Sequence, residues 1–219
     1  MLKDLHRRID HAALQPQVDE TAITQLCKEA IEFNFYAVAV NPAWVKQAAE
    51  ELEGTDVNIV SVSGFPLGAS RSDIKVAEAM EAVYDGAHEI DMVTNIGWLA
   101  SDRFLEVEAE IRKVRRNLPD DIVLKVIIEA GKLTPAQQVE ATKAVINGGA
   151  QFVKTCTGFF GGATVQQVKT LATVANGKIE IKASGGIRTI EDCRKLLAAG
   201  ATRLGSSASV AIIREMTTN

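Results

Sequence analysis

The segment GGAQFVK, residues 148–154, closes a helical pattern at glycine and leads, through Ala150, into an apolar strand pattern that ends at a lysine. The same joint occurs as DGAHEID (85–91) and AGATRLG (199–205). Glycine ends a helix readily, because it accepts a left-handed backbone, and alanine then packs the turn. The fifth residue after each glycine is expected near the carboxyl end of its strand, and these residues are Asp91, Lys154 and Gly205.

Strand-like and helical patterns alternate along the whole chain. Apolar, β-branched runs occur at 36–40, 57–64, 88–93, 121–129, 151–155, 178–184 and 202–207, and RRIDHAAL (7–14) supplies an opening run. The clearest helical patterns are at 72–86, 102–119 and 134–149, and the first and last of these begin at a good N-cap and end at glycine. Strand and helix therefore repeat in a regular order.

Eight strands, each followed by a helical segment at a repeat of about 27 residues, are typical of a (β/α)8 barrel. A doubly wound open sheet is the structural alternative, but no Gly-rich dinucleotide fingerprint follows the first strand. The chain also has no linker or low-complexity stretch. We therefore predict an α/β fold, a TIM barrel forming a single domain over residues 1–219.

The composition excludes several classes of protein. The chain has 219 residues, of which 47% are hydrophobic, and this is enough for a sizeable core. A net charge of -4 argues against a general nucleic-acid binder. Three scattered cysteines and three histidines without ligand spacing argue against a disulfide framework or a metal site. The absence of a long apolar run argues against a signal peptide or a membrane span, so we expect a cytoplasmic protein.

Three lysines occupy strands where an ammonium group is costly. Lys125 lies within VLKVIIE (123–129), Lys154 follows Phe152–Val153, and Lys182 lies within IEIKASGG (179–186). Most lysines are solvated surface residues, but a closed barrel has no edge strand on which to expose them. These strands are consecutive, and the preceding one carries Asp91. Alternation turns all four side chains inward, with Ile90, Val153 and Ile181 facing the helices.

This arrangement indicates imine chemistry. A lysine near other cations has a lowered pKa, because the neighbouring charge disfavours its protonated form. A neutral lysine attacks carbonyl carbons and forms Schiff bases, and a carboxylate beside it helps to move protons. The pattern thus predicts catalysis without a metal or a bound cofactor.

The last two strands predict an anion site. SGGIRT (184–189) and LGSSAS (204–209) follow them, at the position where barrels often bind phosphate through backbone N–H groups. We assign phosphate binding to five residues there, namely Gly185, Gly186, Gly205, Ser206 and Ser207. Thr155, beside Lys154, is added to the substrate-binding set.

Five motifs together resemble deoxyribose-phosphate aldolase, a class I aldolase family with a TIM barrel: FPLGA (65–69), EIDMVTNIG (89–97), LKVIIE (124–129), FVKTCTGF (152–159) and IKASGGIRT (181–189). IDHAAL (9–14) and AVNPAWV (39–45) match more loosely, and the resemblance covers nearly the whole chain in order.

The resemblance implies a role for each charged residue. Lys154 is implied as the Schiff-base lysine, Lys182 as the lysine that perturbs it, and Asp91 as a proton carrier paired with Lys125. The implied reaction is reversible cleavage of 2-deoxy-D-ribose 5-phosphate to D-glyceraldehyde 3-phosphate and acetaldehyde, in deoxyribose phosphate catabolism. The implied partner is thus a small phosphorylated sugar, and we expect a homodimer.

Three positions depart from the usual family pattern, namely Ala12, Cys156 and Ala208. Ala208 lacks a hydroxyl, but we expect its backbone N–H to remain available to phosphate. Two alternative functions stay open on the residues alone. One is another Schiff-base lyase or transferase on the same barrel, such as a different phosphosugar aldolase, and the other is a phosphosugar-binding protein without catalysis.

Overall fold

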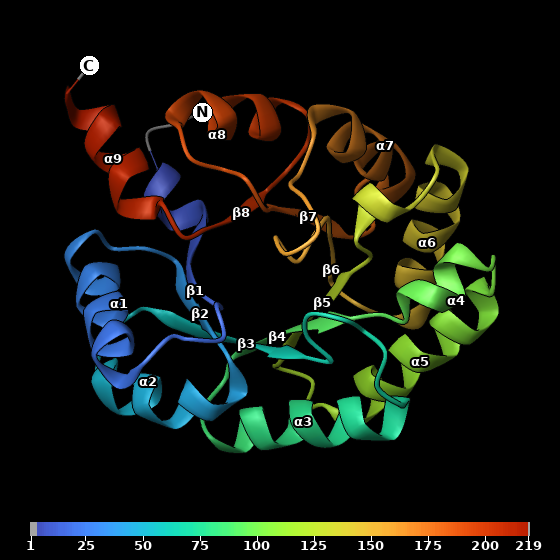
Figure 1. Ribbon diagram of the computed structural model, residues 1–219, viewed down its shortest axis with the longest axis horizontal. Coiled ribbons are helices and arrows are strands. Elements are labelled where there is room, and N and C mark those ends of the chain that lie inside the picture. Colours follow the sequence, from blue (N-terminus) through green and yellow to red (C-terminus); the bar gives the residue numbers. More distant parts are fainter. Residues whose placement is uncertain (1–3, 219) are drawn as a thin grey trace.

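A computed structural model describes residues 4–218, so residues 1–3 and 219 of the domain expected over 1–219 lie outside the described part. Eight parallel strands form one closed barrel in sequence order, and β8 pairs with β1 to close it (Figure 1). The strands are Ile9–Ala13 (β1), Ala37–Val40 (β2), Asn58–Ser63 (β3), Glu89–Val93 (β4), Val123–Ile127 (β5), Phe152–Lys154 (β6), Glu180–Ser184 (β7) and Arg203–Ser206 (β8). The predicted TIM barrel is confirmed.

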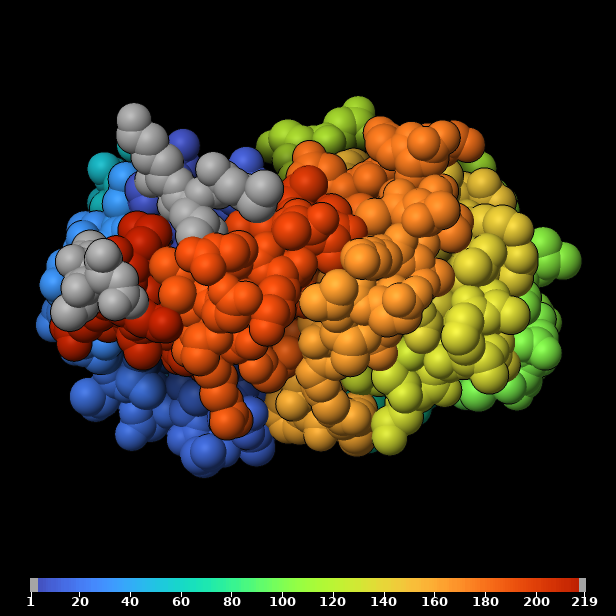
Figure 2. Space-filling model, turned by 90° about the horizontal axis from the view of Figure 1, so that it is seen from above, coloured from blue at the N-terminus to red at the C-terminus, as the bar shows by residue number. Residues whose placement is uncertain are grey.

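Helices surround the barrel (Figure 1). They are Glu20–Glu32 (α1), Val45–Glu51 (α2), Ser72–Tyr84 (α3), Ile96–Ala100 (α4), Phe104–Asn117 (α5), Pro135–Gly148 (α6), Val165–Ala175 (α7), Ile190–Ala198 (α8) and Ser209–Thr218 (α9). Short 3₁₀ helices lie at Leu5–Arg8, Pro42–Trp44 and Ala130–Lys132. Figure 2 shows the C-terminal helices, orange to red, beside the blue N-terminal segment, as the β1–β8 pairing requires. Among residues 4–218, no helix is long and apolar enough to cross a membrane.

Alternation along the strands separates two environments. Ile90, Val153 and Ile181 belong to the large buried cluster that also contains the inner faces of the helices. Ala39 and Val60 belong to a second, smaller buried cluster. Because successive side chains of a strand point to opposite faces, the charged residues that alternate with the first set are left facing the barrel interior.

The helix starts agree with the sequence for α6 and differ for α3. Thr134 and Gln137 form a reciprocal capping box at α6, and Gly149 ends that helix with a left-handed backbone, φ 86°. Ser72 was expected to cap α3, but the N-cap residue is Arg71, which makes no side-chain cap hydrogen bond. The Ser72 hydroxyl instead donates to Glu110 Oε1 at 3.3 Å.

The Ser72 hydroxyl bonds to Glu110 and not to the start of α3, because the Glu110 carboxylate is buried and needs hydrogen-bond donors. Lys75 Nζ of α3 donates to Glu110 Oε1 of α5 at 2.9 Å, and both side chains are fully buried. Thr94 Oγ1 and the Asn95 backbone N–H, just after β4, donate to Glu110 Oε2 at 3.2 and 3.0 Å. A buried ion pair persists when its remaining hydrogen-bonding capacity is satisfied in this way.

Replacing Gly148 with alanine should destabilise the barrel by loosening the contact between α5 and α6. A Cβ at this position would lie 2.5 Å from Cγ2 of the fully buried Ile111. Overpacking of this kind costs about 1–3 kcal/mol of unfolding free energy. Chemical denaturation measures the change. Gly131→Ala is the matched control, because the nearest atom to its Cβ would be 3.8 Å away. Equal stability of the two variants would contradict the packing argument.

Candidate active site

The four charged residues expected inside the barrel lie in direct contact. Asp91 Oδ1 accepts a hydrogen bond from Lys125 Nζ at 2.9 Å. Asp91 Oδ2 accepts hydrogen bonds from Lys154 Nζ and Lys182 Nζ, both at 2.7 Å. All four side chains are buried. One carboxylate on β4 therefore joins three ammonium groups on β5, β6 and β7.

The barrel stagger places these groups at different heights. Lys154 is the last residue of β6, as expected, and pairs in register with Lys182. Asp91 was also expected near the end of its strand, but it lies in the middle of β4, level with Lys125. Lys154 is level with Ile127 and thus one inward position above Lys125. Asp91 therefore reaches upward from below to Lys154 and Lys182, and both lysines line the cavity.

A second layer of charge lies beneath, and the sequence reasoning missed it. Asp10 of β1 forms an ion pair with Lys182, and Glu89 Oε2 of β4 lies 2.5 Å from Lys125 Nζ. Arg203 Nη1 of β8 bridges the two carboxylates, at 3.0 Å from Asp10 Oδ1 and 3.2 Å from Glu89 Oε2. All three added residues are buried.

Strand alternation was the signal that would have identified two of these residues. Glu89 is two positions before Asp91, and Arg203 is two positions before Gly205, so each shares the inward face of its strand. Arg203 also stacks over the ring of Tyr36, with 3.5 Å between its guanidinium carbon and the ring centroid. No comparable pattern singles out Asp10 in the opening strand.

The charges in this cluster are unequal in number. The carboxylates are Asp10, Glu89 and Asp91, and the basic groups are Lys125, Lys154, Lys182 and Arg203. Burial makes an uncompensated charge costly. The net charge of the cluster is zero when one of its lysines is neutral.

The pKa of the Lys154 amine lies below that of an ordinary lysine. Burial is the largest cause that lowers its pKa, and the charges of Lys182 and Lys125 lower it further. The charge of Asp91 acts in the opposite direction, and the resulting pKa is about 8. Lys182 thus lowers the pKa of Lys154, as predicted, but burial lowers it more. For Lys125, the charges of Asp91 and Glu89 outweigh burial and raise the pKa. Burial raises the pKa of Asp91, but its three lysines outweigh burial and hold that pKa well below its usual value.

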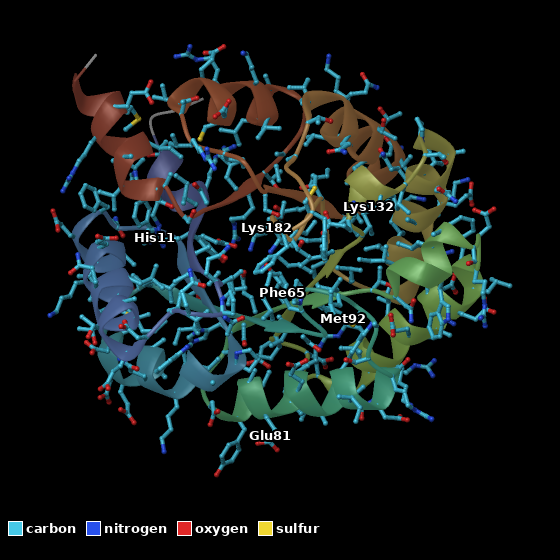
Figure 3. The ribbon with its side chains drawn as sticks, in the orientation of Figure 1. His11, Phe65, Glu81, Met92, Lys132 and Lys182 are labelled. Carbon is cyan, nitrogen blue, oxygen red and sulfur yellow. The ribbon has the colours of Figure 1, made fainter. Side chains whose placement is uncertain are left out.

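A cavity of about 240 Å³ opens above Lys154 and Lys182. Figure 3 shows Lys182 within the ring of helices, on the inner side of the barrel. The five residues assigned to phosphate all line this cavity, namely Gly185, Gly186, Gly205, Ser206 and Ser207. Arg188, in the same loop as the first two, also lines it and was missed, although it stands within the quoted SGGIRT motif.

Two adjacent glycines shape the loop after β7. Gly185 and Gly186 have φ angles of 89° and 73°, a region that other residues rarely adopt. A Cβ on Gly185 would lie 2.8 Å from the Gly161 carbonyl oxygen. The loops after β6 and β7 can therefore meet only as bare backbone, which leaves space and N–H groups at the cavity wall.

Several assignments change once side-chain partners are known. Thr155 does not line the cavity, because it is buried and its hydroxyl donates to the Ser184 carbonyl at 3.2 Å. The Ser206 hydroxyl donates to the Ile187 carbonyl at 2.8 Å and accepts from the Ala208 N–H at 3.0 Å. The Ala208 N–H, expected to be available to an anion, is thus already bonded. Ser207 is exposed at the cavity wall.

The carboxylate of Glu129, in the turn after β5, binds the segment that follows Lys154. Glu129 has a left-handed backbone, φ 48°, and a buried side chain. Its Oε2 accepts hydrogen bonds from the N–H of Thr157 at 2.9 Å and from the Thr157 hydroxyl at 2.6 Å. Cys156 is buried, and burial is the largest cause that raises its thiol pKa to about 11. Glu129 therefore positions Thr157 at the cavity, and Cys156 is a neutral packing residue.

Comparison with known proteins agrees with this geometry. The family model described as DeoC/LacD family aldolase matches residues 4–214. The chain belongs to this family. It is 45% identical to deoxyribose-phosphate aldolase of Natranaerobius thermophilus over 214 residues, with 97% of each chain covered. It is 47% identical to the Deinococcus radiodurans enzyme of the same name over 206 residues, covering 94% of this chain and 93% of that one.

Solved structures show the same fold. The aldolase superposes on QR15, an aldolase, with a TM-score of 0.93 and 38% identity, covering 99% of this chain and 97% of that one. It superposes on deoxyribose phosphate aldolase from Aeropyrum pernix, described as tetrameric, with a TM-score of 0.89 and 29% identity. That match covers 98% of this chain and 92% of that one. The chain is therefore a carbon–carbon lyase of the aldolase type.

Replacing Lys182 with methionine should move the acid limb of the aldolase pH–rate profile to higher pH. Removing a positive neighbour raises the pKa of Lys154 from about 8, so less of its neutral form is present at pH 7. A rise of one pKa unit costs about 10-fold in activity there. The full profile of kcat/KM measures the shift. Lys178→Met, which removes an exposed lysine, should leave it in place. An unmoved acid limb in Lys182→Met would disprove the electrostatic coupling.

Proposed function

We propose that the protein catalyses the reversible cleavage of 2-deoxy-D-ribose 5-phosphate to D-glyceraldehyde 3-phosphate and acetaldehyde through a Schiff base on Lys154. The observation that carries this proposal is the amine of Lys154. It is held by Asp91 at 2.7 Å, its pKa is lowered to about 8, and it faces a cavity rimmed by glycine backbone. The proposed role is the breakdown of deoxyribose phosphate in the cytoplasm.

Imine formation begins with the neutral amine. The nitrogen lone pair of Lys154 attacks the C1 aldehyde carbon of the open-chain sugar, and the carbonyl oxygen takes up a proton to give a carbinolamine. Loss of that hydroxyl as water, after a second protonation, gives the iminium ion. Lys182 and Asp91 share a 2.7 Å hydrogen bond beside this nitrogen and are placed to supply and recover the proton.

Cleavage uses the iminium ion as an electron acceptor. A base removes the proton of the C3 hydroxyl, the C3–O bond becomes a carbonyl, and the electrons of the C2–C3 bond move to the iminium nitrogen. D-Glyceraldehyde 3-phosphate leaves, and an enamine remains on Lys154. Protonation of the enamine at C2 and addition of water then release acetaldehyde. The low pKa of Asp91 keeps this residue ionised in the free enzyme, where it accepts hydrogen bonds from the three lysines.

The phosphate group is proposed to bind at the cavity wall formed by the residues that follow β7 and β8. Gly185 and Gly186 expose backbone there, Ser207 adds an exposed hydroxyl, and Arg188 adds a guanidinium. Backbone N–H groups and a guanidinium are the donors that phosphate oxygens prefer. The Ser206 hydroxyl is left out of this set, because its hydrogen bonds support the turn after β8.

A coupled assay for D-glyceraldehyde 3-phosphate tests the overall reaction, with Lys154→Met as the inactive control. Release of the product by the native protein alone supports the proposal. A protein that binds the sugar phosphate without cleaving it would support a binding function instead.

Borohydride reduction should fix an ethyl group on Lys154 when the protein is incubated with acetaldehyde. The reason is that Lys154 has the lowered pKa, whereas the pKa of Lys125 is raised. Peptide mass mapping locates the modification, and Lys154→Met should show none. Modification of Lys125 or Lys182 in the native protein would overturn the assignment of the nucleophile.

Replacing Ser207 with aspartate should weaken binding of the phosphorylated substrate selectively. A carboxylate near the phosphate adds like-charge repulsion of about 1–4 kcal/mol at a separation of 4 Å, depending on the dielectric. We expect KM for deoxyribose 5-phosphate to rise by at least about 5-fold relative to KM for unphosphorylated deoxyribose. Ser207→Asn controls for size without charge. Equal effects of Ser207→Asp on both substrates would place the phosphate elsewhere.

A further inference from the structure

Two phenylalanine rings from separate loops meet at the carboxyl ends of the strands. Phe65 lies in the turn after β3 and Phe159 in the loop after β6, with 5.4 Å between the ring centroids and 86° between the ring planes. This is the edge-to-face arrangement that aromatic pairs prefer. Phe159 is 37% exposed and lines the cavity together with Lys154. Figure 3 shows Phe65 inside the ring of helices, so the pair stands next to the proposed reaction site.

The aromatic pair bounds the cavity on one side. Among residues 4–218, those that line the cavity belong to β6, β7, β8, β1 and β2 or to the loops after them, and β3, β4 and β5 contribute none. These three strands are neighbours in the closed barrel. Phe65 comes from the β3 end of this region and Phe159 from β6, beyond its other end. Their contact is therefore the wall between the cavity and the β4–β5 side of the barrel.

Hydrogen bonds fix the backbone on both sides of Phe159. Its N–H donates to the Thr157 hydroxyl oxygen at 3.1 Å, and that hydroxyl donates to the buried Glu129 carboxylate at 2.6 Å. Further along the loop, the Ala163 N–H donates to the Gly185 carbonyl oxygen at 3.0 Å. The ring of Phe159 is thus presented to the cavity by a loop that is held at both ends.

The loop that carries Phe65 is fixed as well. The Gly64 N–H donates to Glu78 Oε2 at 2.6 Å, and the Gly68 N–H donates to the Gly64 carbonyl oxygen at 2.7 Å. A Cβ on Gly68 would lie 2.1 Å from the Thr94 carbonyl oxygen, so this loop packs as bare backbone on the residues that follow β4. The ring of Phe65 is therefore a fixed support.

We infer that Phe159, supported by Phe65, sets the size of the aldehyde that can react at Lys154. The inference rests on the proposed function, because it concerns the second aldehyde of that reaction. In the direction of synthesis, acetaldehyde forms the enamine on Lys154, and the electrons of the enamine double bond form a bond from its C2 to the carbonyl carbon of the acceptor. The acceptor oxygen takes up a proton, and hydrolysis of the iminium ion returns the amine. The rest of the acceptor lies in the cavity beside Phe159.

A fixed aromatic wall favours narrow acceptors over wide ones. The cavity holds about 240 Å³, which is less than the roughly 300–1,000 Å³ of pockets that take drug-sized ligands. D-Glyceraldehyde 3-phosphate is an unbranched three-carbon chain and needs no displacement of the ring. An acceptor that carries a phenyl group would have to displace Phe159, and the hydrogen bonds of both loops oppose that displacement.

Cross-aldol reactions with acetaldehyde as the donor test the inference. Propanal and 3-phenylpropanal are the acceptors, since they differ by one phenyl group, and chromatography of each cross-aldol product gives the two values of kcat/KM. Phe159→Ala should raise the ratio of 3-phenylpropanal to propanal by at least about 10-fold, because it removes the wall that the phenyl group meets. Phe159→Tyr, which keeps a ring, should retain the native ratio.

Phe160→Ala is the matched control. Phe160 is the next residue in the chain and is 40% exposed, but it does not line the cavity. Its ring lies instead beside Lys132, whose Nζ is 5.7 Å from the ring centroid. This variant should keep the native ratio, and circular dichroism checks that every variant is folded.

Phe65→Ala tests the support independently. It should also raise the ratio, because Phe159 then loses the ring that holds it in place. Adding Phe65→Ala to Phe159→Ala should have no further effect, since Phe65 acts only through Phe159.

Two results would overturn the inference and leave the proposed function standing. One is an unchanged ratio in Phe159→Ala while the native protein is active with propanal, and the other is an equal rise in Phe160→Ala. A native protein that forms no cross-aldol product with either acceptor, and that does not cleave deoxyribose 5-phosphate, would overturn the proposed function and this inference with it.

Discussion

One buried carboxylate bound to three lysines is the interaction on which the barrel interior depends. Asp91 accepts hydrogen bonds from Lys125, Lys154 and Lys182, all of them out of contact with bulk water. An ammonium group buried without a partner costs several kcal/mol, so these lysines can occupy neighbouring strands only while Asp91 lies among them. The packing of β4 to β7 and the chemistry of the site therefore have the same origin.

The second charged layer gives the three lysines different surroundings. Glu89 stabilises the ammonium form of Lys125 from below, and Asp10 and Arg203 tie the first strand to the last. Lys154 lies one inward position above Lys125, where burial lowers its pKa more than the charge of Asp91 raises it. Burial is thus outweighed at Lys125 by the charges of Asp91 and Glu89, whereas at Lys154 it outweighs the charge of Asp91 and leaves the pKa at about 8. Two lysines two strand positions apart in height acquire opposite properties from their neighbours.

The charged cluster, the loops that line the cavity and the contacts between outer helices lie on different elements of the fold. The charged residues are on strands, where packing holds them firmly. The proposed anion site is on glycine-bearing loops, where backbone groups can approach a ligand. The outer helices make contacts of their own, and Lys75 of α3 forms a buried ion pair with Glu110 of α5.

The sequence by itself determined the eight strands, the barrel and the four inward-facing residues Asp91, Lys125, Lys154 and Lys182. These follow from local periodicity, because strand alternation decides which face a residue occupies. It also located the glycine and serine turns that line the cavity. Such features depend on residues close together in the chain, and they are readable without partners.

Only the tertiary structure decided which groups satisfy one another. Asp10 and Arg203 are separated by 193 positions and meet because β8 closes onto β1. Ser72 leaves its capping position for Glu110, and the Ser206 hydroxyl binds Ile187 and Ala208. A buried polar group bonds to the partner that lies nearest in the folded chain, and the closing of the barrel decides which distant residues become neighbours. The combination of burial and charge that lowers the pKa of Lys154 to about 8 is accordingly a property of the closed barrel.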